Sequence, residues 1–74
     1  MSKVTVHTEV AGTVWKVLVR PGDMVAVEQD LVVVESMKME IPAVAPMAGT
    51  VEQVLAVEGE AVTEGQALVV MRRH

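Results

Sequence analysis

The chain repeats itself after 37 residues. The tetrapeptide Ala-Gly-Thr-Val at 11–14 returns at 48–51, and pairing positions 11–37 with 48–74 gives twelve identities in 27 pairs. Chance matching in a sequence so rich in valine would give roughly three, so the repeat reflects a duplicated structural unit. The duplication predicts an internal two-fold symmetry relating halves of about 1–37 and 38–74.

Composition restricts what each unit can form. Eighteen of the 74 residues are Val and only one is aromatic, so the core must consist of small and branched aliphatic side chains. Such residues favour strands over helices, and no segment shows a helical period. A chain of this length has room for one domain, 1–74, and without cysteine it has no disulfide to support its core.

Each half is expected to contain about four short strands separated by glycine turns. The apolar stretches predict strands at 4–7, 13–19, 24–27, 31–34, 40–45, 50–57, 61–62 and 68–71. Alternation fails within 13–19, which predicts a bulge near Trp15 and Lys16. Pro42 suggests an edge strand or a strand end.

The turns are expected to repeat as well. Pro21-Gly22 suits a type II turn, in which the second central residue has a positive φ, and the second copy retains the glycine as Gly59. Gly65 corresponds to Glu28 in the first copy. If Gly65 has a positive φ, Glu28 adopts the same conformation at a cost of about 1 kcal/mol.

Charge and hydropathy exclude several classes of function. The formal net charge is −4, whereas nucleic-acid binding requires a basic surface, and binding to an anionic membrane is disfavoured for the same reason. No stretch of 18 apolar residues and no signal-peptide pattern is present. We therefore expect a free-standing, cytoplasmic protein that binds neither nucleic acid nor membrane.

The joint between the two copies contains the main candidate site. One unit alone cannot cover its own apolar face, but two units packed face to face form a small sandwich or flattened barrel. In that arrangement the joint is an exposed hairpin with Met37 and Lys38 at its turn. Neither is a turn former, and Asn-Gly or Asp-Gly is the usual choice there. A local rule broken at one exposed position indicates function.

The motif at this joint resembles that of a known family. Met37-Lys38-Met39 follows a Val-Val-Glu strand at the centre of the duplicated unit, and Glu35, Ser36 and Glu40 complete the signature. This pattern resembles the biotinyl domain of biotin-dependent carboxylases, and the short chain resembles stand-alone biotin/lipoyl attachment proteins. The resemblance covers about residues 9–71. A "thumb" insertion found in the first half of some bacterial carriers is missing between Gly12 and Gly22.

The resemblance implies an all-β fold, a flattened barrel (barrel-sandwich hybrid) of two four-stranded sheets with the attachment lysine on an exposed hairpin. It implies that a biotin protein ligase attaches biotin covalently to Lys38, and that Met37 and Met39 occupy positions read by the ligase and the carboxylase. Its other partners would be a biotin carboxylase and a carboxyltransferase acting on an acyl-CoA or similar acceptor. The protein would be a non-catalytic carrier, since no acid–base pair and no set of a nucleophile with its base can be assembled from the sequence.

Alternatives remain for the motif itself. A lipoyl carrier of a 2-oxo acid dehydrogenase shares the fold and the lysine, with lipoate as its cofactor, although Asp before the lysine and a small residue after it are more usual there. A structural barrel of the efflux-adaptor kind typically lacks the lysine. Met37 and Met39 can be read as packing residues, and Glu35 and Glu40 as solvated charges.

Three other side chains have simpler interpretations. Trp15, whose repeat partner is Glu52, is interpreted as a cover over the barrel side, with partner docking as the alternative. His7 and His74 are interpreted as surface histidines, and no metal site is predicted.

Overall fold

The computed structural model describes residues 2–74, and this part of the chain contains eight strands and no helix. No helix that could cross a membrane is present in the same range. The strands are β1 Lys3–His7, β2 Gly12–Val17, β3 Met24–Val25, β4 Asp30–Ser36, β5 Met39–Val44, β6 Gly49–Val54, β7 Ala61–Val62 and β8 Ala67–Arg73.

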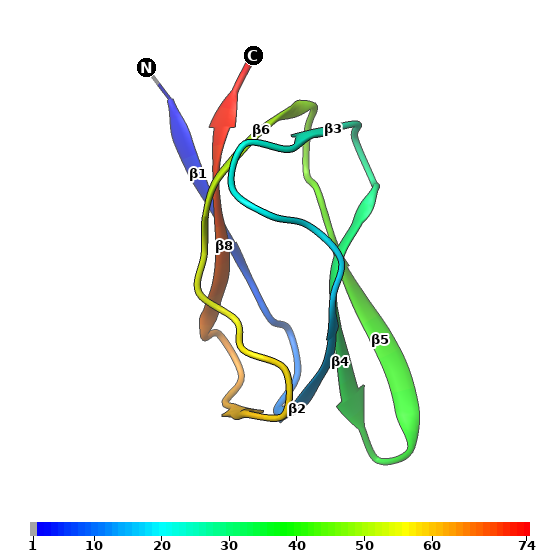
Figure 1. The fold of residues 1–74 in the computed structure, drawn as a ribbon. Coiled ribbons are helices and arrows are strands. Elements are labelled where there is room, and N and C mark those ends of the chain that lie inside the picture. The colour runs from blue at the N-terminus through cyan, green and yellow to red at the C-terminus, as the bar shows by residue number, and fades with distance from the viewer. Residues whose placement is uncertain (1) are drawn as a thin grey trace.

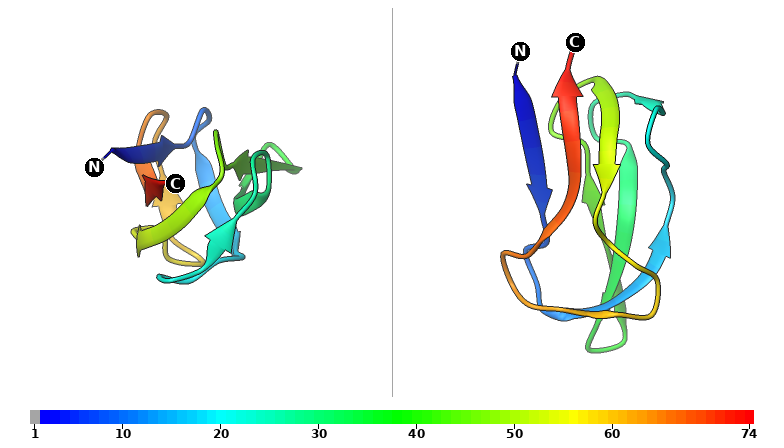
Figure 2. Two further views of the ribbon diagram at one scale, coloured as in Figure 1. Left: turned by 90° about the horizontal axis from the view of Figure 1, so that it is seen from above. Right: turned by 60° about the vertical axis from the view of Figure 1, so that its left-hand side comes forward.

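The strands form two four-stranded antiparallel sheets that lie face to face (Figures 1 and 2). One sheet has the order β5-β4-β2-β7 and the other has the order β1-β8-β6-β3. The two orders correspond: strands at the same place in each order are equivalent under the 37-residue repeat. The prediction of an all-β fold of two four-stranded sheets is confirmed. β5, which carries Pro42, lies at a sheet edge as predicted.

The two sheets share their register as well as their order. Val14 pairs with Val34 on β2 and β4, and the equivalent residues Val51 and Met71 pair on β6 and β8. Each pair is followed by a register shift, so the predicted bulge at Trp15 is confirmed and recurs in the second copy.

The halves are intertwined, which differs from the predicted stacking of one unit on the other. Each sheet takes two strands from each half, because β5 and β7 flank the β4–β2 pair, and β1 and β3 flank the β8–β6 pair. These cross-half pairings satisfy backbone groups at edges that a separate half would leave open. Several expected strands are also shorter, because the stretches expected at 13–19, 24–27 and 50–57 end as strands at Val17, Val25 and Val54.

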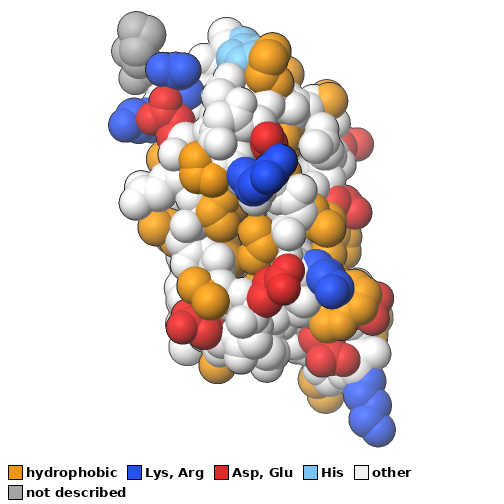
Figure 3. All heavy atoms as spheres, viewed as in Figure 1, with side chains coloured by type: hydrophobic (Ala, Val, Ile, Leu, Met, Phe, Trp, Pro, Cys, Tyr) orange, Lys and Arg blue, Asp and Glu red, His pale blue; other side chains and the backbone are white. Residues whose placement is uncertain are grey.

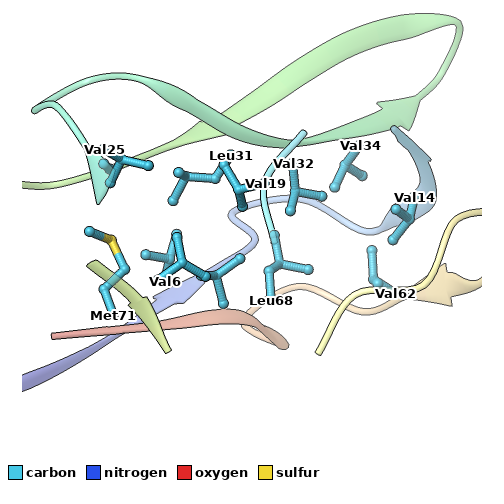
Figure 4. Close-up of a cluster of buried hydrophobic side chains, with 13 residues drawn as sticks. Val6, Val14, Val19, Val25, Leu31, Val32, Val34, Val62, Leu68 and Met71 are labelled. Carbon is cyan, nitrogen blue, oxygen red and sulfur yellow. The ribbon is translucent and has the colours of Figure 1, made fainter. Parts of the chain in front are cut away.

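The core lies between the sheets and is almost entirely aliphatic (Figure 4). Leu31 and Leu68 are repeat partners, and both are fully buried. The cluster comprises Val6, Val14, Val19, Val25, Leu31, Val32, Val34, Ala45, Val51, Val62, Leu68, Val69 and Met71. The body is elongated, and its extents are 35 × 17 × 17 Å.

The predicted turn conformations are confirmed. Gly22 and Gly59 have φ values of 97° and 91°, and Glu28 adopts 67° where its partner Gly65 adopts 87°. The backbone N–H of Glu28 donates to the carbonyl of Ala45 at 2.7 Å, which helps to hold the glutamate in this conformation.

Candidate functional site

The hairpin that joins β4 to β5 forms one end of the molecule. Ser36 pairs with Met39, so Met37 and Lys38 alone form the loop. Figure 1 shows this hairpin at the end opposite the two termini. Lys38 is exposed, and it makes no ion pair within residues 2–74.

The loop has a left-handed backbone at both residues. Met37 has a φ of 51° and Lys38 has a φ of 67°. Two successive positive φ values define the primed turn that matches the twist of a hairpin, but residues with a Cβ adopt them at a cost of about 1 kcal/mol or more each. Apart from Glu28, these are the only non-glycine residues between 2 and 74 with a positive φ.

The two methionines beside the lysine project into solvent. Met37 is 92% exposed and Met39 is 65% exposed, and neither belongs to the core cluster. The interpretation of this pair as packing residues is therefore wrong. Two adaptable apolar side chains on either side of an exposed amine are a suitable surface for a partner protein.

The remaining motif residues lie on the two strands of the hairpin. Glu35 and Glu40 face each other across β4 and β5, and both are exposed, whereas Ser36 is half-buried. All six motif residues thus lie within the hairpin, as the sequence predicts. Their functional roles stay predictions.

The base of the hairpin depends on a glycine that the sequence analysis did not assign to the site. A Cβ placed on Gly12 would lie 2.2 Å from the backbone oxygen of Glu35, so β2 and β4 can approach there only because Gly12 has no side chain. Gly49 has the same relation to Arg72, at 2.4 Å. Recurrence of the glycine at the same repeat position was the signal that could have identified it. A shallow depression beside the hairpin is lined by Ala11, Gly12, Thr13, Glu35, Ser36, Met37 and Lys38.

The other candidate side chains lie away from the loop. Trp15 is 44% exposed on β2, and the Lys16 Nζ lies 5.6 Å from its ring centroid. His7 Nδ1 is 2.9 Å from the Gly65 carbonyl oxygen. Between residues 2 and 74 no three His, Asp or Glu side chains are grouped so that they could hold a metal ion.

This geometry defines a small carrier-type scaffold, an all-β body that presents one exposed amine at a strained hairpin. The family described as "Biotin-requiring enzyme" matches residues 3–71 of the chain. The biotin/lipoyl attachment protein of Bacillus subtilis (strain 168) is 46% identical over 65 residues, which cover 88% of this chain and 89% of that protein. The biotin carboxyl carrier protein of Streptococcus mutans is 43% identical over 65 residues, 88% of this chain and half of that protein.

Among solved structures, a single-chain, multi-domain long-chain acyl-CoA carboxylase contains a segment that superposes with a TM-score of 0.92. The superposition covers 97% of this chain and 7% of that protein at 33% identity. The chain belongs to the biotin/lipoyl attachment family, and the resemblance noted in its sequence is confirmed.

Proposed function

We propose that this chain is a biotin carboxyl carrier in which a biotin protein ligase acylates the side-chain amine of Lys38. The observation that carries the proposal is the position of this amine. It lies on an exposed two-residue loop at one end of the body, between two exposed methionines. Membership of the biotin/lipoyl family supports biotin as the group attached.

The residues of the hairpin fit a covalently attached group. Lysine supplies four methylenes and a terminal amine, which together make a long and flexible tether. In the acylation, Nζ forms an amide bond to the carboxyl carbon of biotin, the activating group departs from that carbon, and the amine loses its protons to solvent or to the ligase. The modification removes one positive charge, so the net charge changes from −4 to −5.

The role of the chain itself is to position the attached cofactor for the enzymes that use it. Lys38 would hold biotin, and the ureido ring of biotin would supply the carboxyl-carrying chemistry, which belongs to the cofactor. Lys38 holds the group at the narrow end of a rigid body, where a large active site can receive it. Tethering gives the group a high effective concentration at each site that the carrier visits.

The proposed partners are a biotin carboxylase and a carboxyltransferase acting on an acyl-CoA or similar acceptor. The structural relative is a segment of an acyl-CoA carboxylase, in which the equivalent domain belongs to a much larger chain. We propose that residues 1–74 act as one non-catalytic cytoplasmic domain in such a system.

Intact mass after incubation with the ligase of the same host tests the assignment. Wild-type protein should gain one biotinyl group, and both Lys38→Ala and Lys38→Arg should gain none. Lys16→Arg is the matched control, because it changes an exposed lysine on the neighbouring strand and should remain fully modified. An unmodified wild type, or a modified Lys38→Arg variant, would contradict the proposal.

Lipoate is a second candidate, because the B. subtilis relative is named for both groups. The same mass measurement, made with a lipoyl ligase and lipoate, separates the two assignments because the adducts differ in mass. A lipoyl adduct without a biotinyl adduct would favour the lipoyl carrier.

A further inference from the structure

The exposed sulfur atoms of the chain gather at the hairpin that carries Lys38. The sequence has six Met and no Cys, so all of its sulfur is thioether sulfur. Met37 is 92% exposed and Met39 is 65% exposed, whereas Met71 in the core is fully buried. Met24 on β3 is the third exposed methionine between residues 2 and 74. Two of these three exposed thioethers thus lie on either side of the amine that the proposed function requires.

The hairpin holds both methionine side chains in solvent. Figure 3 shows a basic side chain that projects at the lower right with hydrophobic side chains beside it, at the end where Figure 1 places the β4–β5 hairpin. Met37 has a left-handed backbone, and Met39 pairs with Ser36 at the base of the loop. Neither methionine packs on the core cluster, so dissolved reagents reach both of them.

An exposed thioether reacts with a hydroperoxide. A lone pair of the sulfur attacks one oxygen of hydrogen peroxide, an S–O bond forms, the O–O bond breaks, and water leaves. The sulfur is oxidised to a sulfoxide and the peroxide is reduced. This converts a flexible apolar side chain into a polar one. Because the chain has no Cys, no thiolate of its own competes for the oxidant.

We propose that Met37 and Met39 form a reversible oxidation site that controls whether the ligase can modify Lys38. This inference rests on the proposed function, because it assigns a regulation to the same hairpin. In the reduced form the two side chains offer an adaptable apolar surface beside the amine. In the sulfoxide form each brings an extra polar oxygen into that contact, and a polar group buried without a hydrogen-bond partner opposes binding.

The positions of the methionines let this change occur without damage to the fold. Met37 and Met39 lie outside the core, so their oxidation removes no core packing. Met71, whose sulfoxide would place a polar group among aliphatic side chains, is sheltered as long as the chain is folded. Thiol-dependent reductases, one for each sulfoxide epimer, restore the thioether, while two thiols become a disulfide and the oxygen leaves as water. The change is therefore reversible.

Brief treatment of the unmodified, folded protein with hydrogen peroxide tests the proposal. The treatment precedes biotinylation, because biotin carries a thioether of its own. Peptide mapping should find one added oxygen on each of Met24, Met37 and Met39 and none on Met71. Circular dichroism should show unchanged thermal unfolding. The kcat/KM for biotinylation by the purified ligase should fall about fivefold or more, because the sulfoxides are polar. Both sulfoxide reductases, supplied with dithiothreitol, should restore it.

Leucine variants assign the effect to the hairpin, when each treated sample is compared with the untreated sample of the same variant. Met37→Leu combined with Met39→Leu leaves the hairpin without sulfur, so peroxide should not change its rate, whatever that rate is. Met24→Leu is the matched control, because it removes the exposed thioether on β3 and should lose as much on oxidation as the wild type. The single variants Met37→Leu and Met39→Leu keep one sulfur each and should show intermediate losses.

Wild-type protein that carries both mapped sulfoxides and is biotinylated at the untreated rate would overturn the proposal. An equal loss in the double leucine variant would also overturn it, because oxidation elsewhere would then be the cause. A loss that the reductases do not reverse would contradict a reversible site. Untreated wild type that takes no biotin would overturn the proposed function instead, so the two failures are distinguishable.

Discussion

Gly12 passes so close to Glu35 that a Cβ on the glycine would lie 2.2 Å from the glutamate's backbone oxygen. Such a separation is shorter than any that a real Cβ makes, and the obstacle is backbone, which cannot rotate away. We therefore expect Gly12→Ala to lower the free energy of unfolding by about 3 kcal/mol or more. Urea denaturation followed by far-UV circular dichroism measures this.

Gly49→Ala should behave in the same way, because the equivalent distance to Arg72 is 2.4 Å. Gly22→Ala is the control, because its missing Cβ has open space around it and only its φ of 97° opposes a side chain. This control should cost about 1–2 kcal/mol. Equal losses at the three positions would show that close approach of the strands is not the cause.

The two-fold symmetry of the core predicts equal responses at equivalent positions. Leu31 and Leu68 are both fully buried, so Leu31→Ala and Leu68→Ala should each destabilise the fold by about 3 kcal/mol. Leu18 and Leu55 form a matched exposed pair, at 51% and 42%, and their replacement by Ala should cost less than about 1 kcal/mol. A clear difference between Leu31→Ala and Leu68→Ala would contradict equivalence of the halves.

Met39 allows binding to be separated from folding. Because Met39 is 65% exposed, Met39→Leu should leave stability within about 0.5 kcal/mol while it slows biotinylation or carboxyl transfer. Met24→Leu changes another exposed methionine, 74% exposed on β3 and away from the hairpin, and should leave both rates unchanged. Normal rates in Met39→Leu would mean that neither enzyme reads this side chain.

Much of the fold could be predicted because the chain is duplicated. The repeat aligned Glu28 with Gly65 and so predicted a left-handed glutamate, which the structure contains. Broken alternation predicted the bulge at Trp15, and the missing turn residues identified the Met37-Lys38 loop. In each case a local backbone rule acted on a short segment, which is where sequence patterns carry the most information.

The intertwining of the halves could not be predicted in this way. It depends on the four edge strands β1, β3, β5 and β7, each of which pairs with a strand of the other half, and β3 and β7 are too short to show a periodic pattern. The contact between Gly12 and Glu35 likewise depends on how two strands approach in space. The ion pairs of Glu52 with Lys3 and Arg72 also depend on the strand register, which brings three residues from separate parts of the sequence together.

The left-handed backbone of Met37 predicts that replacing this residue can stabilise the fold and at the same time weaken recognition by the ligase. Met37→Gly should raise the free energy of unfolding by about 0.5–1 kcal/mol, because it removes the Cβ that opposes a φ of 51°. For a domain of this size, that corresponds to an increase of a few degrees in Tm. The same change removes a side chain that is 92% exposed beside Lys38, so biotinylation by the ligase should slow.

Glu28→Gly separates the two effects. Glu28 has a φ of 67°, and its repeat partner is already glycine, so this replacement should stabilise the fold by a similar amount. It lies at the other end of β4 from the hairpin and should leave biotinylation unchanged. If Met37→Gly stabilises the protein and is biotinylated at the wild-type rate, the strained methionine serves neither folding nor the ligase. If both variants lose stability instead, packing around these residues outweighs backbone strain.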